Sequence, residues 1–92
     1  MKGFNINGAS YVEHQGKLFQ LILRFDGELE ILPDAAVPEG QRGPLDACTD
    51  EVHDMTHWVE LGETDLCVVT ESIHGRRRTT RYSLPLEPLN AE

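Results

Sequence analysis

Three short turn signals divide the first third of the chain, and they constrain its fold more than any other feature. Asn7-Gly8 is typical of a two-residue hairpin turn, while His14-Gln15-Gly16 and Phe25-Asp26-Gly27 each fit a three-residue loop closed by glycine. Between these turns the segments are rich in aliphatic, β-branched and aromatic residues, as strands are. We therefore expect a four-stranded antiparallel meander.

The turns also assign the cross-strand pairs. The expected pairs are Ile6 with Ala9, Phe4 with Tyr11, Tyr11 with Phe19, Leu21 with Ile31, and Leu23 with Leu29. One face of the meander would then be apolar, with Phe4, Ile6, Ala9, Tyr11, Phe19, Leu21, Leu23, Leu29 and Ile31. Because Val12, Leu18 and Ile22 fall on the opposite face, we expect that side to be partly covered as well.

A helix is predicted over residues 44–62, after a loop over 33–43 that is rich in proline and glycine. Pro44 suits a first helical position and Gly62 a stop. Five residues recur at helical intervals along one stripe: Leu45, Cys48, Val52, Met55 and Val59. The opposite side carries Asp46, Asp50, His53, Asp54 and His57, which we expect to face solvent.

Two strands follow the predicted helix, over residues 66–70 and 79–84. A three-residue loop, Ile73-His74-Gly75, would place Leu66 opposite Tyr82, Val68 opposite Thr80 and Glu71 opposite Arg77. The prolines at 85 and 88 end the sheet, and residues 87–92 would form a loose tail. The expected fold is α+β in the order ββββαββ, a single domain over residues 1–92 with an ordered core of about 2–86 and the helix packed on one face of the sheet.

Charge and composition exclude several classes of protein. The chain has 16 Asp and Glu against 8 Lys and Arg, for a net charge of −8, which disfavours general binding to nucleic acid. It has no apolar run of the length that a signal peptide or a membrane span needs, so a cytoplasmic protein is expected. In that compartment Cys48 and Cys67 would be reduced thiols, and acidic neighbours would raise the thiol pKa of Cys48.

Two histidines on the predicted helix raise the alternative of a metal site. His53 and His57 are four residues apart, a spacing at which two imidazoles can reach one ion, with Asp50 or Asp54 as a third ligand. The glutamate that zinc proteases place after the first histidine is replaced by Asp54, which removes their general base. The other interpretation is a solvated helix face, and we predict no metal and no cofactor.

Arginines and one tryptophan are the candidate binding residues. Arg76, Arg77, Arg78 and Arg81 lie on the last hairpin, where they could contact an anionic ligand or nucleic acid. Alternate strand residues point to opposite faces, however, so the four cannot all converge on one ligand. Trp58, at the border of the helix stripe, either caps the core or anchors an interface.

No catalytic motif is present, whether a nucleophile elbow, a phosphate loop or a dinucleotide fingerprint. We therefore predict a small, non-catalytic, acidic module for protein interaction or regulation. One helix would leave part of a six-stranded sheet uncovered, so we expect a homodimer held by apolar contact or strand pairing, and a further protein partner.

Overall fold

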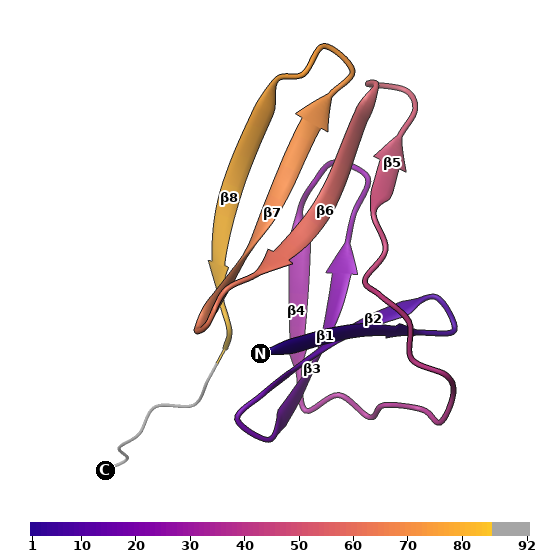
Figure 1. Cartoon of the computed structure of the whole chain (residues 1–92), viewed down its shortest axis with the longest axis vertical. Coiled ribbons are helices and arrows are strands. Elements are labelled where there is room, and N and C mark those ends of the chain that lie inside the picture. Colours follow the sequence, from indigo (N-terminus) through magenta and orange to yellow (C-terminus); the bar gives the residue numbers. More distant parts are fainter. Residues whose placement is uncertain (86–92) are drawn as a thin grey trace.

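Two four-stranded antiparallel sheets make up residues 1–85, the part of the chain that the computed structural model describes (Figure 1). The first sheet consists of β1 (Lys2–Ile6), β2 (Ala9–His14), β3 (Lys17–Leu23) and β4 (Leu29–Pro33). The second consists of β5 (Cys48–Asp50), β6 (Met55–Leu61), β7 (Asp65–Ser72) and β8 (Arg77–Ser83). In both sheets the strands follow the order of the sequence, so hairpin turns join neighbours within a sheet.

The predicted helix over residues 44–62 is wrong, and with it the α+β fold: residues 1–85 contain no helix. Residues 48–61 form a β-hairpin, in which β5 and β6 are joined by a turn over 51–54. Asp54 has a φ of 55°, a left-handed value that a right-handed helix cannot contain. The Asp50 carboxylate closes the turn by accepting hydrogen bonds from the N–H groups of Val52 and His53. Val52, expected in the core stripe, is 84% exposed.

Two of the three predicted meander turns are confirmed. Ile6 opposes Ala9 across the first turn, and Leu23 opposes Leu29 across the third. The second turn is wrong by one residue, because Gln15 and Gly16 alone form it, with φ values of 53° and 77°. Positive φ at both positions is the geometry of a two-residue hairpin turn, and it requires no third residue.

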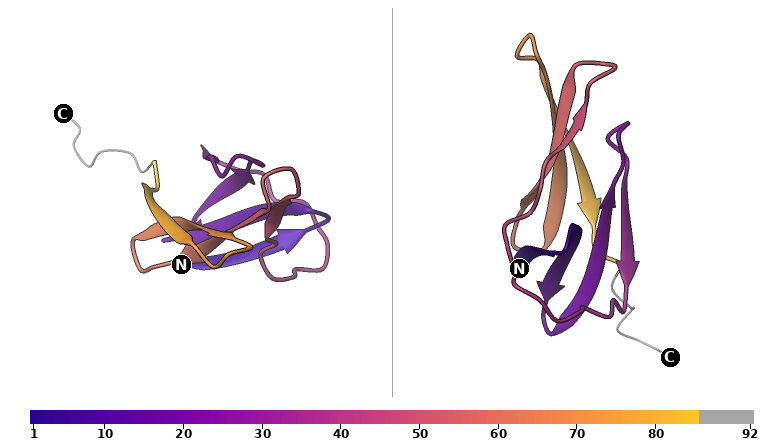
Figure 2. Two further views of the ribbon diagram at one scale, coloured as in Figure 1. Left: turned by 90° about the horizontal axis from the view of Figure 1, so that it is seen from above. Right: turned by 90° about the vertical axis from the view of Figure 1, so that its right-hand side faces the viewer.

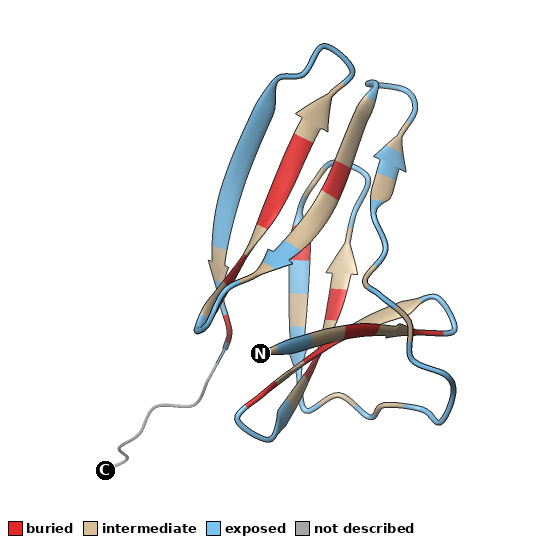
Figure 3. Ribbon diagram, viewed as in Figure 1, coloured by how far each residue is buried: buried red, intermediate tan, exposed pale blue. Residues whose placement is uncertain are grey.

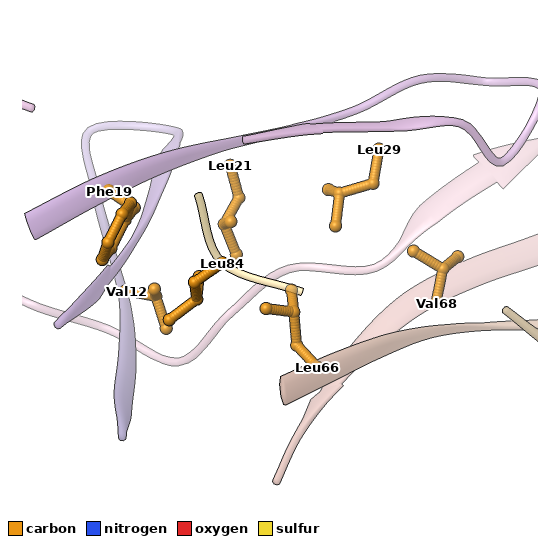
Figure 4. Close-up of a cluster of buried hydrophobic side chains, with 7 residues drawn as sticks. All are labelled: Val12, Phe19, Leu21, Leu29, Leu66, Val68 and Leu84. Carbon is orange, nitrogen blue, oxygen red and sulfur yellow. The ribbon is translucent and has the colours of Figure 1, made fainter. Parts of the chain in front are cut away.

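That one-residue difference moves side chains to the other face, since successive strand residues alternate between faces. Phe19 opposes Val12 instead of Tyr11. Val12 therefore joins the main core between the sheets, where four residues of the first sheet pack against three from the second half of the chain (Figure 4): Val12, Phe19, Leu21 and Leu29 against Leu66, Val68 and Leu84.

Other apolar residues of the meander form a second cluster. Phe4, Ile6 and Tyr11 are buried together, with Leu18, Ala9, Ala35 and Val37 packed against them. The segment between β4 and β5 covers this cluster: the guanidinium of Arg42 lies 4.0 Å from the ring centroid of Phe4, and Asn5 and Gly43 exchange two backbone hydrogen bonds. Both faces of the meander are thus covered, as expected, but by a sheet and a loop instead of a helix.

The predicted cross-strand pairs of the last hairpin, β7 and β8, are confirmed. Leu66 opposes Tyr82, Val68 opposes Thr80 and Glu71 opposes Arg77, although the strands extend further than expected. The predicted loose tail, residues 87–92, lies outside the described residues. No helix that could cross a membrane occurs in residues 1–85.

The two sheets pack closely near the middle of the molecule and diverge toward the end that carries the β3–β4 turn and the tips of the second sheet (Figure 2). Figure 3 shows that those tips and most of β8 are exposed. Two hydrogen bonds join the sheets across this region: Tyr82 Oη accepts from the N–H of Leu29 at 3.3 Å, and the ring of His57 contacts the carbonyl of Phe25.

Candidate functional site

A cleft of about 710 Å³ opens where the sheets diverge. The first sheet contributes the β3–β4 turn, and the second contributes β5, the β5–β6 turn, β6 and one residue of β8. The lining residues are Phe25, Asp26, Thr49, Asp50, Glu51, Val52, His53, Met55, His57 and Arg78. The cleft thus combines apolar side chains with charges of both signs.

His57 sets the base of the cleft. It is 1% exposed, with Nε2 2.9 Å from the carbonyl oxygen of Phe25 and Nδ1 2.8 Å from Oγ1 of Thr70. A carbonyl oxygen only accepts hydrogen bonds, so Nε2 carries a proton and donates to Phe25, while Nδ1 shares a hydrogen bond with the Thr70 hydroxyl. His57 therefore ties the β3–β4 turn of one sheet to β6 and β7 of the other.

Glycine at position 27 makes room for this ring. Gly27 has a φ of +90°, and a Cβ atom built there would lie 3.0 Å from Cε1 of His57. Glycine adopts that φ without strain, and a Cβ atom at this position would displace the imidazole by a few tenths of an ångström. The Asp26-Gly27 pair, noticed in the sequence as a turn signal, therefore also serves the contact between the sheets.

Phe25 forms one lip of the cleft. The residue is 69% exposed, yet hydrogen bonds fix its backbone. The carbonyl accepts from His57, and the turn is closed by a 2.9 Å hydrogen bond from the N–H of Arg24 to the carbonyl of Glu28. Oδ1 of Asp26 accepts from the N–H of Glu28 at 2.9 Å. An exposed aromatic ring is thus held on a rigid turn.

Val52 forms the opposite lip, on a turn that is held as firmly. Oδ1 of Asp50 accepts from the N–H groups of Val52 and His53 at 3.1 and 3.2 Å, and Oδ2 lies 2.8 Å from Nδ1 of His53. The side-chain hydrogen bond from His53 is the main cause that lowers the pKa of the Asp50 carboxyl, and the backbone bonds add to it. Asp50 is therefore negatively charged at neutral pH.

The four candidate metal ligands do not form one set. His53 pairs with Asp50, whereas both ring nitrogens of His57 are engaged inside the protein. Asp54 lies in the turn, where its carbonyl accepts from the N–H of Ile73. The helical spacing that suggested the site does not exist, and residues 1–85 hold no group of three His, Cys, Asp or Glu side chains that could bind a metal ion.

The four candidate arginines are also separated. Arg77 and Arg81 lie on the outer face of the second sheet, where they pair with Glu71 and Asp65, each at 3.2 Å. Arg76 is in the β7–β8 turn. Arg78, the only one of the four to line the cleft, points toward the first sheet. Strand alternation therefore divides the arginines as the sequence indicated.

Trp58 lies on the outer face of the second sheet, away from the cleft. Its Nε1 donates to Oε2 of Glu60 at 3.0 Å, and the Arg77 guanidinium lies 5.5 Å from its ring centroid. It stands opposite Val69, which is 2% exposed. These contacts make Trp58 a cover for Val69, with its polar atom satisfied within the sheet.

Both cysteines are free thiols, as expected. Cys48 lies on β5 and Cys67 on β7. Burial, and after it the charge of Asp50, raises the pKa of the Cys48 thiol, which makes that thiol a poor nucleophile at neutral pH.

Sequence reasoning missed the two lips of the cleft. The sequence predicts Phe25 only as the first residue of a turn, and it predicts Val52 as a core residue. For Phe25 the signal was present: a large aromatic residue next to Asp26-Gly27 must lie on a turn, where little can bury it.

The chain matches no protein-family model, no curated protein and no solved structure. The geometry of the cleft is therefore the basis on which a function can be assigned.

Proposed function

We propose that this protein is a non-catalytic interaction module whose cleft receives a short segment of a partner protein. One observation carries the proposal: Phe25 and Val52 expose 69% and 84% of their surface on the two lips of the same cleft. Folding alone gives no reason to expose large apolar side chains on facing turns, whereas an interface does. Met55 adds a flexible apolar side chain to the lining, and methionine is enriched in protein interfaces.

The rigidity of both lips supports binding. Hydrogen bonds from His57 and within the turn fix the backbone at Phe25, and the Asp50 carboxylate fixes it at Val52. Association then orders little of the protein, so less of the contact free energy is lost to entropy. Exposed apolar groups on such fixed supports are typical of binding hot spots.

The net charge of −8 favours a protein partner over nucleic acid, because a strongly acidic surface repels phosphates at long range. A regulatory role, and the cytoplasmic location expected from the sequence, belong to the same proposal. The expected homodimer is also part of this proposal, but the apolar residues that would hold it together are not those expected from the sequence. Val12 is buried in the core and Leu18 packs against the second cluster, so neither can hold a dimer together, and a second copy would instead cover Phe25 and Val52 at the cleft.

Substitutions at the lips test the proposal. Immobilised protein would capture partners from the source cell, and Phe25→Ser and Val52→Ser should each reduce a captured protein at least tenfold, because each removes one apolar lip. Leu32→Ser is the control, since Leu32 is exposed on β4 and does not line the cleft. Phe25 and Val52 are mostly exposed, so their replacement should change the unfolding free energy by about 0.5 kcal/mol or less.

Quantitative mass spectrometry of the captured proteins gives the readout. Loss of the same protein with both lip variants and its retention with Leu32→Ser would support the cleft as the binding site. Equal capture by all variants would contradict it. If the protein captured is the bait itself, and sedimentation shows a dimer that Val52→Ser dissociates, a second copy of this chain is the partner.

A further inference from the structure

The register of the second sheet places opposite charges at the two sides of the cleft. Four residues lie side by side across its strands, from β5 to β8: Cys48, His57, Thr70 and Arg78. Asp50 lies two residues after Cys48 on β5 and opposes Met55 on β6. Glu51 follows Asp50 and begins the β5–β6 turn. Within the second sheet, Asp50 and Glu51 are therefore on the β5 side, Arg78 is on the β8 side, and His57 and Met55 lie between them.

The charges at the two ends are free to meet a partner. Within residues 1–85, the ion pairs of the second sheet engage Arg77, Arg81 and Asp50, whereas neither Glu51 nor Arg78 takes part in one. Both are exposed. Arg78 is the single arginine or lysine that lines a cleft with three carboxylates, and it is separated from Asp50 by the width of the sheet.

The spacing of these charges selects a particular kind of segment. Neighbouring strands are about 4.8 Å apart, so three strand spacings from β5 to β8 make about 14 Å. An extended chain rises about 3.4 Å per residue, so four residues cover the same distance. Side chains at positions i, i+2 and i+4 of an extended segment point to one face. Three such side chains can therefore reach the acidic side, the apolar middle and Arg78 together.

We propose, building on the proposed function, that the cleft binds an extended segment of a partner protein that has an apolar residue at its centre. Two residues away on one side the segment carries Lys or Arg, which meets Glu51 and the charge of Asp50. Two residues away on the other side it carries Asp or Glu, which meets Arg78. The apolar side chain lies between Phe25 and Val52, over Met55.

Synthetic peptides test this pattern. The first two have phenylalanine at the centre, with Lys and Glu two residues away on either side, one peptide for each chain direction. A third has the same composition but places each charge one residue from the centre, so that both point to the opposite face. A fourth replaces both charges by glutamine. Dissociation constants come from NMR titration of the Val52 and Met55 methyl signals.

One of the first two peptides should bind about fivefold tighter than the displaced-charge peptide, the upper range for exposed ion pairs. Arg78→Glu should remove that advantage, and a peptide with Lys on both sides should restore it in this variant, which a merely structural effect of the substitution would not do. Arg76→Glu is the matched control, because Arg76 is a neighbouring arginine that does not line the cleft. It should leave the affinity within about twofold.

The failures of the two proposals can be told apart. Equal affinity for all four peptides, with the cleft signals shifted by each, would overturn the charge pattern and leave the cleft as an apolar binding site. Shifts from no peptide would overturn the proposed function as well. Loss of binding in Arg78→Glu without rescue by the double-lysine peptide would overturn the pairing of Arg78 with a carboxylate.

Discussion

Replacing His57 by leucine should destabilise the protein by about 2–3 kcal/mol, because the two side chains are similar in size but leucine makes no hydrogen bond. The carbonyl of Phe25 and the hydroxyl of Thr70 would both lose their partner, and Thr70 is buried. For a domain of this size the melting temperature should fall by roughly 10 °C or more. Thermal melts followed by circular dichroism give the measurement.

His74→Leu is the matched control for that change. His74 is exposed in the β7–β8 turn, so its replacement should change the unfolding free energy by about 0.5 kcal/mol or less. His57→Ala should cost more than His57→Leu, since it adds a cavity to the lost hydrogen bonds. Equal melting temperatures for His57→Leu and the unsubstituted protein would show that the ring does not hold the two sheets together.

Val68→Asp should unfold the protein, whereas Val52→Asp should leave it folded. Val68 is 2% exposed in the core between the sheets, and an unpaired carboxylate buried there costs several kcal/mol, comparable to the whole stability of a small domain. Val52 is 84% exposed on its turn, where a charge is solvated and the change should be within about 0.5 kcal/mol. Denaturant titration of both variants measures the difference.

The same pair of variants separates the β-hairpin from the helix that the sequence indicated. On the helix stripe, Val52 would be a core residue, and its replacement by aspartate would unfold the chain. Unfolding of Val52→Asp would therefore contradict the turn over residues 51–54. Asp54→Gly gives a further check, since glycine suits the φ of 55° at that position and should not destabilise the turn.

Local chemistry explains which parts of the fold could be predicted. The first and third meander turns and the last hairpin were correct because the turn residues indicated the right loop length, which sets the pairing of the strands beside the turn. Gly16 did not fix the length of the second turn, since glycine fits the two-residue turn with Gln15 as well as a three-residue loop. The predicted helix was wrong because the spacing of its apolar residues fits the two-residue period of a strand as well as the 3.6-residue period of a helix. Met55 and Val59 are four residues apart, a spacing that shares a face in a strand as well as in a helix. Cys48 joins them by pairing with β6 across the turn, which no window of sequence shows.

The candidate site was predicted in part. Asp50, His53, His57 and Arg78 were singled out as metal ligands or anion contacts, and all four line the cleft, although in other roles. These polar residues could be predicted as site candidates because carboxylate, imidazole and guanidinium groups can bind ligands whether a helix, a strand or a turn carries them. The exposure of Val52 could not, since it depends on the turn that replaces the helix.

The most direct test of the cleft as a binding site is a measurement of where the ligand lies. Isotope-filtered NOE spectra of the protein with the tightest of the peptides would detect contacts from the ligand's phenylalanine ring. The expected contacts are to the methyl groups of Val52 and Met55 and to the ring of Phe25, which line the cleft together. Contacts to the outer face around Trp58, with none to Val52 or Met55, would contradict this account.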